Sequence, residues 1–80
     1  MEVPEEEMQS TYKSRMIRLK LLEDKIKENK KMPEDDILRF GMNRWMMSRL
    51  IVQRYVDDLI AAGHIKHTFE NGIFYVEIAE

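Results

Sequence analysis

The spacing of apolar residues in the first part of the chain predicts a long amphipathic helix over residues 11–29. Apolar side chains recur there every three or four positions, which places them on one face of a helix. This stripe consists of Tyr12, Met16, Leu19, Leu22 and Ile26. A narrower strip of Ile17 and Leu21 is either the edge of the core or a contact with another chain, and we favour the core edge. Lysines after Asn29 suit the negative end of the helix dipole.

A second helix is predicted from Glu34 to about Trp45. Pro33 fits its first turn, where a missing backbone N–H is not needed, and acids follow at the positive end of the dipole. Gly41 is a weak point inside this helix, because glycine costs about 1 kcal/mol relative to alanine there.

The boundary between the second and third helices allows two interpretations. Either the second helix continues to Trp45 and Met46–Met47 form a turn before Ser48, or it stops at Gly41 and Asn43 caps a longer third helix. We favour the first, because Ser48 is the better-placed N-cap. The large side chains around this boundary are expected to fill a small core; they are Met42, Trp45, Met46 and Met47.

The third helix is predicted to begin at Ser48, whose hydroxyl can accept a hydrogen bond from an otherwise unpaired amide of the first turn. Val52, Val56 and Leu59 recur at helical spacing and form its inward face. Gly63 follows as a C-terminal stop, since glycine tolerates the left-handed conformation that ends many helices.

After the third helix the apolar period becomes two, which predicts two strands. Asn71–Gly72 lies between them and is a strong hairpin signal, because both central turn positions need positive φ. With these two loop residues the apolar side chains fall on one face, and Lys66 opposes Glu77 on the other. The predicted pairs on the apolar face are Ile65 with Ile78, His67 with Val76, and Phe69 with Phe74.

A chain of 80 residues forms one domain. Its formal net charge of −2 does not indicate a nucleic-acid binder, but the charges are unevenly distributed. Residues 1–10 carry four glutamates and no basic residue, whereas residues 11–32 carry eight basic and three acidic side chains. Because residues 1–10 also lack apolar periodicity, we expect a flexible acidic N-terminal arm before a domain that spans residues 11–80.

The absence of cysteine excludes disulfides, thiolate nucleophiles and cysteine-ligated metals. No apolar run is long enough to cross a membrane, and the acidic start lacks the basic and apolar regions of a signal peptide. We therefore expect an intracellular, cytoplasmic protein without membrane association.

No active site or metal centre emerges from the residue pattern. His64 and His67 have no metal-ligand motif around them, and His67, on the apolar face, is expected to be a partly buried structural residue. Asp35–Asp36 and Asp57–Asp58 are helix neighbours about 100° apart, so neither pair can flank one substrate atom. We expect no catalysis, no metal and no small-molecule cofactor.

One stretch of the chain carries a resemblance to a known superfamily. Its residues are Met47-Ser48-Arg49, Val52, Arg54-Tyr55-Val56, Asp58-Leu59, Ala62-Gly63 and Ile65. A small polar cap opens this helix, and Ala-Gly-x-Ile leads into the following strand. With the order of predicted elements over about residues 12–79, this stretch resembles the winged helix-turn-helix superfamily of transcription regulators. In size the chain is similar to stand-alone regulators of archaea and of their viruses and plasmids.

The resemblance implies three helices and a two-stranded wing, an α+β and mainly helical fold in which the third helix, at about 48–62, enters the DNA major groove. The candidate DNA-binding residues are Arg44, Ser48, Arg49, Leu50, Gln53, Arg54 and Lys66. Arginine can pair with guanine and glutamine with adenine, and Ser48 with the first-turn amides can bind a phosphate. The wing tip departs from the superfamily, because it carries Glu70 where many DNA-reading wings carry a basic residue.

We therefore predict a sequence-specific DNA-binding regulator of transcription that acts as a homodimer, in the host cytoplasm if a virus or plasmid encodes it. The basic strip of the first helix is assigned to the dimer interface or the DNA backbone; it consists of Lys13, Arg15, Arg18 and Lys20. The alternative is a winged-helix protein–protein interaction module that does not bind DNA. The net charge, the acidic wing tip and the outward Leu50 and Ile60 suit that alternative.

Overall fold

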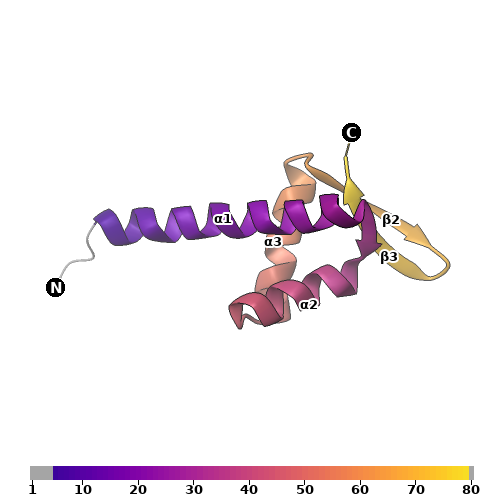
Figure 1. Ribbon diagram of the computed structural model, residues 1–80, viewed down its shortest axis with the longest axis horizontal. Coiled ribbons are helices and arrows are strands. Elements are labelled where there is room, and N and C mark those ends of the chain that lie inside the picture. Colours follow the sequence, from indigo (N-terminus) through magenta and orange to yellow (C-terminus); the bar gives the residue numbers. More distant parts are fainter. Residues whose placement is uncertain (1–4, 80) are drawn as a thin grey trace.

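The computed structural model describes residues 5–79 of the chain, with side chains from residue 13 onward. Over these residues the fold is α+β and mainly helical, with three helices and a C-terminal β-hairpin (Figure 1). The elements are α1 (Glu5–Asn29), β1 (Lys31–Pro33), α2 (Glu34–Trp45), α3 (Arg49–Ala61), β2 (Ile65–Glu70) and β3 (Ile73–Ile78). This winged-helix-like order of elements agrees with the predicted fold class.

The first helix is longer than its apolar pattern predicted. α1 begins at Glu5 rather than at residue 11, so residues 5–10 of the expected arm are helical, and residues 1–4 lie outside the described residues. Its end at Asn29 is as predicted, and Lys30 then adopts a positive φ of 66°. In Figure 1 the first half of α1 projects past the other elements, which gives a molecule of 53 × 25 × 19 Å.

The boundary between α2 and α3 follows the favoured interpretation. α2 ends at Trp45, and Met46 adopts the left-handed conformation with φ of 55°. The Ser48 hydroxyl then accepts a hydrogen bond from the backbone N–H of Ile51, at 3.4 Å, and so caps α3. Asn43 lies inside α2, so the alternative in which it caps the third helix is wrong.

Gly41 permits the close approach of α2 and α3. It is buried, and a Cβ added to it would lie 2.6 Å from Val52 Cγ1 and 3.1 Å from Trp45 Cζ3. A contact of 2.6 Å between carbon atoms is far inside their optimal separation of about 3.5–4.0 Å. The residue that weakens α2 locally is therefore the one that allows Val52 to be fully buried against it.

The hairpin has the predicted register, and a third strand joins it. Phe69 lies opposite Phe74, and the other predicted pairs also form. β1 was not predicted; it pairs antiparallel with β3, with Met32 opposite Val76, so the strand order is β1-β3-β2. This strand of three residues ends at Pro33 and is too short to display an alternating pattern.

The core lies where the three helices meet the sheet. Its buried side chains are Leu22, Ile26, Met32, Ile37, Leu38, Val52, Tyr55, Val56, Leu59, Ile65 and Val76. The predicted inward face of the third helix is confirmed. Tyr55 is an unpredicted member, and its hydroxyl accepts a hydrogen bond from Arg18 at 3.2 Å. Met46, expected in the core, is 89% exposed because it occupies the left-handed turn, whereas Met42, Trp45 and Met47 pack against the core.

Candidate nucleic-acid interface

The first two turns of α3 present one side to solvent, and this side carries most of the predicted DNA-binding residues. Leu50 is 62% exposed, and Arg49 and Arg54 are exposed as well. On the opposite side of the helix Val52 and Val56 are fully buried. The core contacts therefore fix which face of α3 remains available to a ligand.

Arg44 and Ser48 lie next to this face, at the end of α2 and at the start of α3. Arg44 is exposed in the last turn of α2. Ser48 is exposed too, but its hydroxyl oxygen accepts the hydrogen bond from Ile51. The first turn of α3 contains no acidic residue, so its positive dipole end is not neutralised from within the helix.

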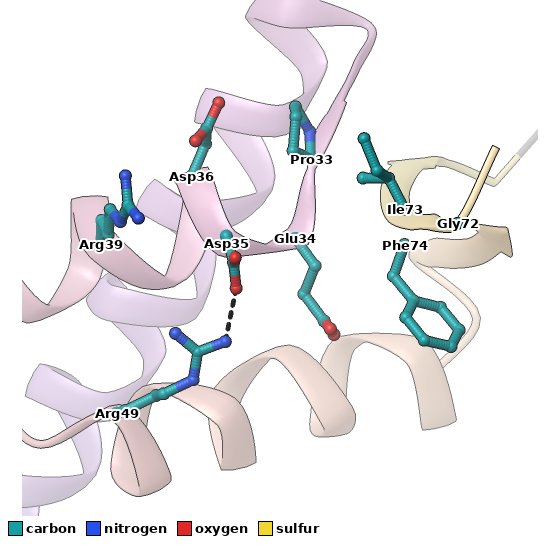
Figure 2. Close-up of a pocket in the computed structure, with 9 residues that line it drawn as sticks. All are labelled: Pro33, Glu34, Asp35, Asp36, Arg39, Arg49, Gly72, Ile73 and Phe74. Atoms are coloured by element: carbon teal, nitrogen blue, oxygen red, sulfur yellow. Dashed lines mark hydrogen bonds and ion pairs between the residues drawn. The ribbon is translucent and has the colours of Figure 1, made fainter. Parts of the chain in front are cut away.

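The acidic first turn of α2 lies against α3 and occupies two of the predicted contact residues. Arg49 donates a hydrogen bond to the Asp35 carboxylate, an ion pair that Figure 2 shows bridging the two helices. This hydrogen bond and the positive charge of Arg49 lower the pKa of the Asp35 carboxyl below its usual value, and the charge of Arg39 adds to the effect. Both partners are more than half exposed, so the pair can open without uncovering buried surface.

Gln53 is held by two carboxylates. Its Nε2 donates to Glu34 Oε2 and to Asp57 Oδ1, each at 3.1 Å. The same Glu34 oxygen lies 2.7 Å from His67 Nε2 on the hairpin, and the Glu34 side chain is only 15% exposed. This network joins α2, α3 and β2, and it uses both N–H donors of the Gln53 amide.

Arg54 differs from these neighbours. It is exposed on α3, and no ion pair of Arg54 is found among the side chains that the structure describes. Of the polar residues predicted on α3, it is the one whose donors remain fully available to a ligand.

The structure separates Lys66 from the α3 residues. Lys66 lies on β2, and its Nζ is 3.0 Å from Glu77 Oε1, the predicted cross-strand pair. Successive side chains of a strand point to opposite faces, so Lys66 lies on the face opposite buried Ile65. Glu70, at the wing tip, accepts a hydrogen bond from Lys31 of β1, and this bond raises the pKa of Lys31.

The wing tip carries exposed apolar side chains on both faces that sequence reasoning did not assign to the site. Phe69 and Phe74 are 60% and 51% exposed on the apolar face, with ring centroids 4.7 Å apart, and Ile73 is 47% exposed on the opposite face (Figure 2). His67 lies against Phe74, with 5.2 Å between ring centroids, and its side chain is 36% exposed, so it is partly covered on the apolar face as expected. The apolar face of the hairpin extends beyond the core, whose last buried residue on β3 is Val76. The alternating pattern does not reveal where burial stops along this face.

An open hollow lies between the first turn of α2 and the wing tip (Figure 2). Its lining combines acidic, basic and apolar side chains, among them Asp35, Asp36, Arg39, Arg49, Ile73 and Phe74. No group of three possible metal ligands occurs among the described residues. Within the same residues, no helix has the length and apolar character needed to cross a membrane.

The basic strip of α1 is largely engaged within the chain. Arg15 pairs with Asp58 and lies over the Tyr55 ring, and Arg18 donates to the Tyr55 hydroxyl. Lys20 pairs with acids of its own helix. These contacts attach α1 to α3 and leave the exposed side of α3 as the main candidate interface.

Comparisons with protein-family models, with curated proteins and with solved structures gave no significant match to this chain. The winged-helix-like fold therefore rests on the arrangement of its own elements, three helices followed by an antiparallel hairpin.

Proposed function

We propose that this protein binds double-stranded DNA through the exposed side of α3 and regulates transcription. The observation that carries the proposal is Arg54, an exposed arginine on a capped helix whose opposite side is fixed in the core. A winged-helix-like domain uses such a helix to enter the major groove, where arginine donates to O6 and N7 of guanine. Regulation would follow from occlusion of a promoter.

The neighbours of Arg54 supply complementary contacts. Leu50 can touch the methyl group of thymine, since it is exposed on the same side of α3. The unpaired amides of the first turn of α3 can bind a backbone phosphate, and Arg44 can reach the phosphate backbone nearby. Arg49 joins them once it leaves Asp35.

The proposed regulator is a homodimer that assembles through α1. This helix extends past the domain, and Ile17 and Met16 on it are 59% and 48% exposed (Figure 1). Met16 was predicted in the core stripe and Ile17 at its edge, so their exposure favours a contact with a second copy of the chain. A twofold dimer would read a pseudo-palindrome with half-sites about one helical turn apart.

The proposal is tested by titrating the protein with random-sequence duplex DNA at two salt concentrations. We expect binding at low salt that weakens as salt rises, because phosphate contacts release counterions. Light scattering on the same samples should give the mass of a dimer. A protein that binds no duplex at low salt, including the DNA upstream of its own gene, is not a DNA-binding regulator.

A second candidate function is supported by the wing tip. The exposed pair of Phe69 and Phe74 is apolar and lies beside Glu70, whose carboxylate is paired with Lys31. Such a pair suits a protein partner, in a module that does not contact DNA. Changing Phe69 and Phe74 to serine should leave duplex binding unaffected under the first proposal, and only a protein interaction would depend on these rings.

A further inference from the structure

The amide of Gln53 is oriented before any ligand arrives. Two carboxylate oxygens, Glu34 Oε2 and Asp57 Oδ1, each lie 3.1 Å from Gln53 Nε2. Ionised carboxylates only accept hydrogen bonds, so the NH2 group of the amide must face them and the carbonyl oxygen must face elsewhere. The group that Gln53 has left for a ligand is therefore its Oε1 acceptor.

The carboxylate of Glu34 is itself held in place from the other side. His67 Nε2 lies 2.7 Å from the oxygen that accepts from Gln53, and the Glu34 side chain is mostly buried. Figure 2 shows this side chain directed from the start of α2 toward α3. A fixed carboxylate keeps the amide in one orientation, which removes the ordering cost that a free glutamine would meet on binding.

We propose that Gln53 reads DNA as an acceptor only and selects a base that presents an amino group in the major groove, adenine or cytosine on the contacted strand. This inference rests on the proposed DNA binding and specifies one element of it. Guanine and thymine present O6 and O4 at the corresponding position, which would face the carbonyl oxygen without a hydrogen between them. The two-bond contact of glutamine with adenine is unavailable, because it needs an amide donor as well as the acceptor.

Asp57 reinforces the same preference. It is exposed on α3 and, when ionised, it also accepts and does not donate. The pair Gln53–Asp57 therefore offers acceptors over one full turn of α3.

The experiment is selection of bound sequences from a randomised duplex library by the wild-type protein and by Gln53→Met, which keeps the side-chain length without hydrogen bonds. We expect one position per half-site where wild type enriches adenine and cytosine over guanine and thymine. That preference should be on the order of two- to tenfold, as one hydrogen bond supplies, and should vanish in Gln53→Met.

A second variant, Glu34→Met, tests the orientation itself. It removes the one oxygen that accepts from Gln53 and faces His67, so an N–H of the Gln53 amide becomes free to turn toward a ligand. The preferred bases at the position should then shift toward guanine and thymine. Asp36→Asn is the matched control, because it removes one negative charge from the same turn and should tighten binding without changing base preference.

The outcomes separate the two proposals. No enrichment of any sequence by the wild-type protein removes both the DNA-binding function and this inference. An enriched site that is unchanged in Gln53→Met, or a Gln53-dependent position that selects adenine alone, guanine or thymine, overturns the inference and leaves DNA binding in place.

Discussion

Replacing Gly41 with alanine measures how closely α2 must approach α3. The added Cβ would lie 2.6 Å from Val52 Cγ1, and Val52 is fully buried and stiff at χ1, so it cannot turn away. Overpacking of this kind costs about 1–3 kcal/mol, whereas alanine gains about 1 kcal/mol over glycine inside a helix. We expect Gly41→Ala to destabilise the domain by up to about 2 kcal/mol, the difference between these two terms.

Val52→Ala removes the atoms that the new Cβ would meet. In that background the closest remaining atom is Trp45 Cζ3 at 3.1 Å, so Gly41→Ala should become neutral or stabilise by up to about 1 kcal/mol. Urea unfolding followed by circular dichroism, with a common m-value for the four proteins, gives each free energy of unfolding. The change of sign between backgrounds is the diagnostic result.

Gly63→Ala is the control for this cycle. Gly63 has a positive φ of 81° and no atom within 4 Å of an added Cβ, so alanine there is strained only through the backbone. Its cost of about 1–2 kcal/mol should be the same with and without Val52→Ala. If Gly41→Ala stabilises the wild-type domain as much as the Val52→Ala variant, the two helices do not pack as described.

Three further results are expected. Leu59→Ala should destabilise by about 2–5 kcal/mol in urea unfolding, since Leu59 lies in the core, and a loss below 1 kcal/mol would contradict its burial. Arg54→Ala should weaken specific DNA binding by about 1–3 kcal/mol in a titration, and an unchanged affinity in both this variant and Arg49→Ala would move the interface elsewhere. Because Arg49 lowers the pKa of the Asp35 carboxyl, this pair contributes stability above the unfolded pKa and loses it as pH falls through the lowered folded pKa. An NMR titration should place the Asp35 midpoint higher in Arg49→Gln, and less so in Arg39→Gln, where only a distant charge is removed.

Elements with a repeating pattern could be predicted from the sequence. The inward residues Val52 and Leu59, the cap Ser48 and the turn Asn71–Gly72 each express a local rule, and each is found as predicted. β1 could not be predicted, since its strand character comes from pairing with β3, far along the chain.

The role of Gly41 was also hidden, because helix propensity describes only the residue and its own helix. Gly41 matters because Val52 of α3 occupies the space that a side chain at position 41 would fill. No spacing of residues within α2 indicates this contact. The exposed phenylalanines of the wing show the same limit. Alternation places Phe69 and Phe74 on the apolar face correctly, but where the core ends along that face depends on the three-dimensional extent of the helices.

The position of the candidate site was predicted, but the pairing of its polar residues with the acids of α2 was not. Helical geometry places Arg49 and Gln53 outward, and the acids of α2 have a sufficient local explanation in the helix dipole. Folding gives these acids a second role, because Asp35 and Glu34 bind residues 14 and 19 positions away. A local explanation for a charge therefore does not exclude a distant partner.

These pairings set the salt dependence that DNA binding should show. With Arg49 neutralised by Asp35 and Arg54 directed at a base, Arg44 is the exposed arginine near the start of α3 that remains for the backbone, so each protomer should neutralise roughly one phosphate. The slope of log affinity against log salt should then be about −1 per protomer, shallow for a DNA-binding protein. Asp35→Asn frees Arg49 and should steepen the slope by about one. The double variant Asp35→Asn with Arg49→Ala should have the slope of the wild-type protein. A slope that steepens equally in the presence and absence of the Arg49 side chain would mean that Asp35 acts by general repulsion of phosphate and not by holding Arg49.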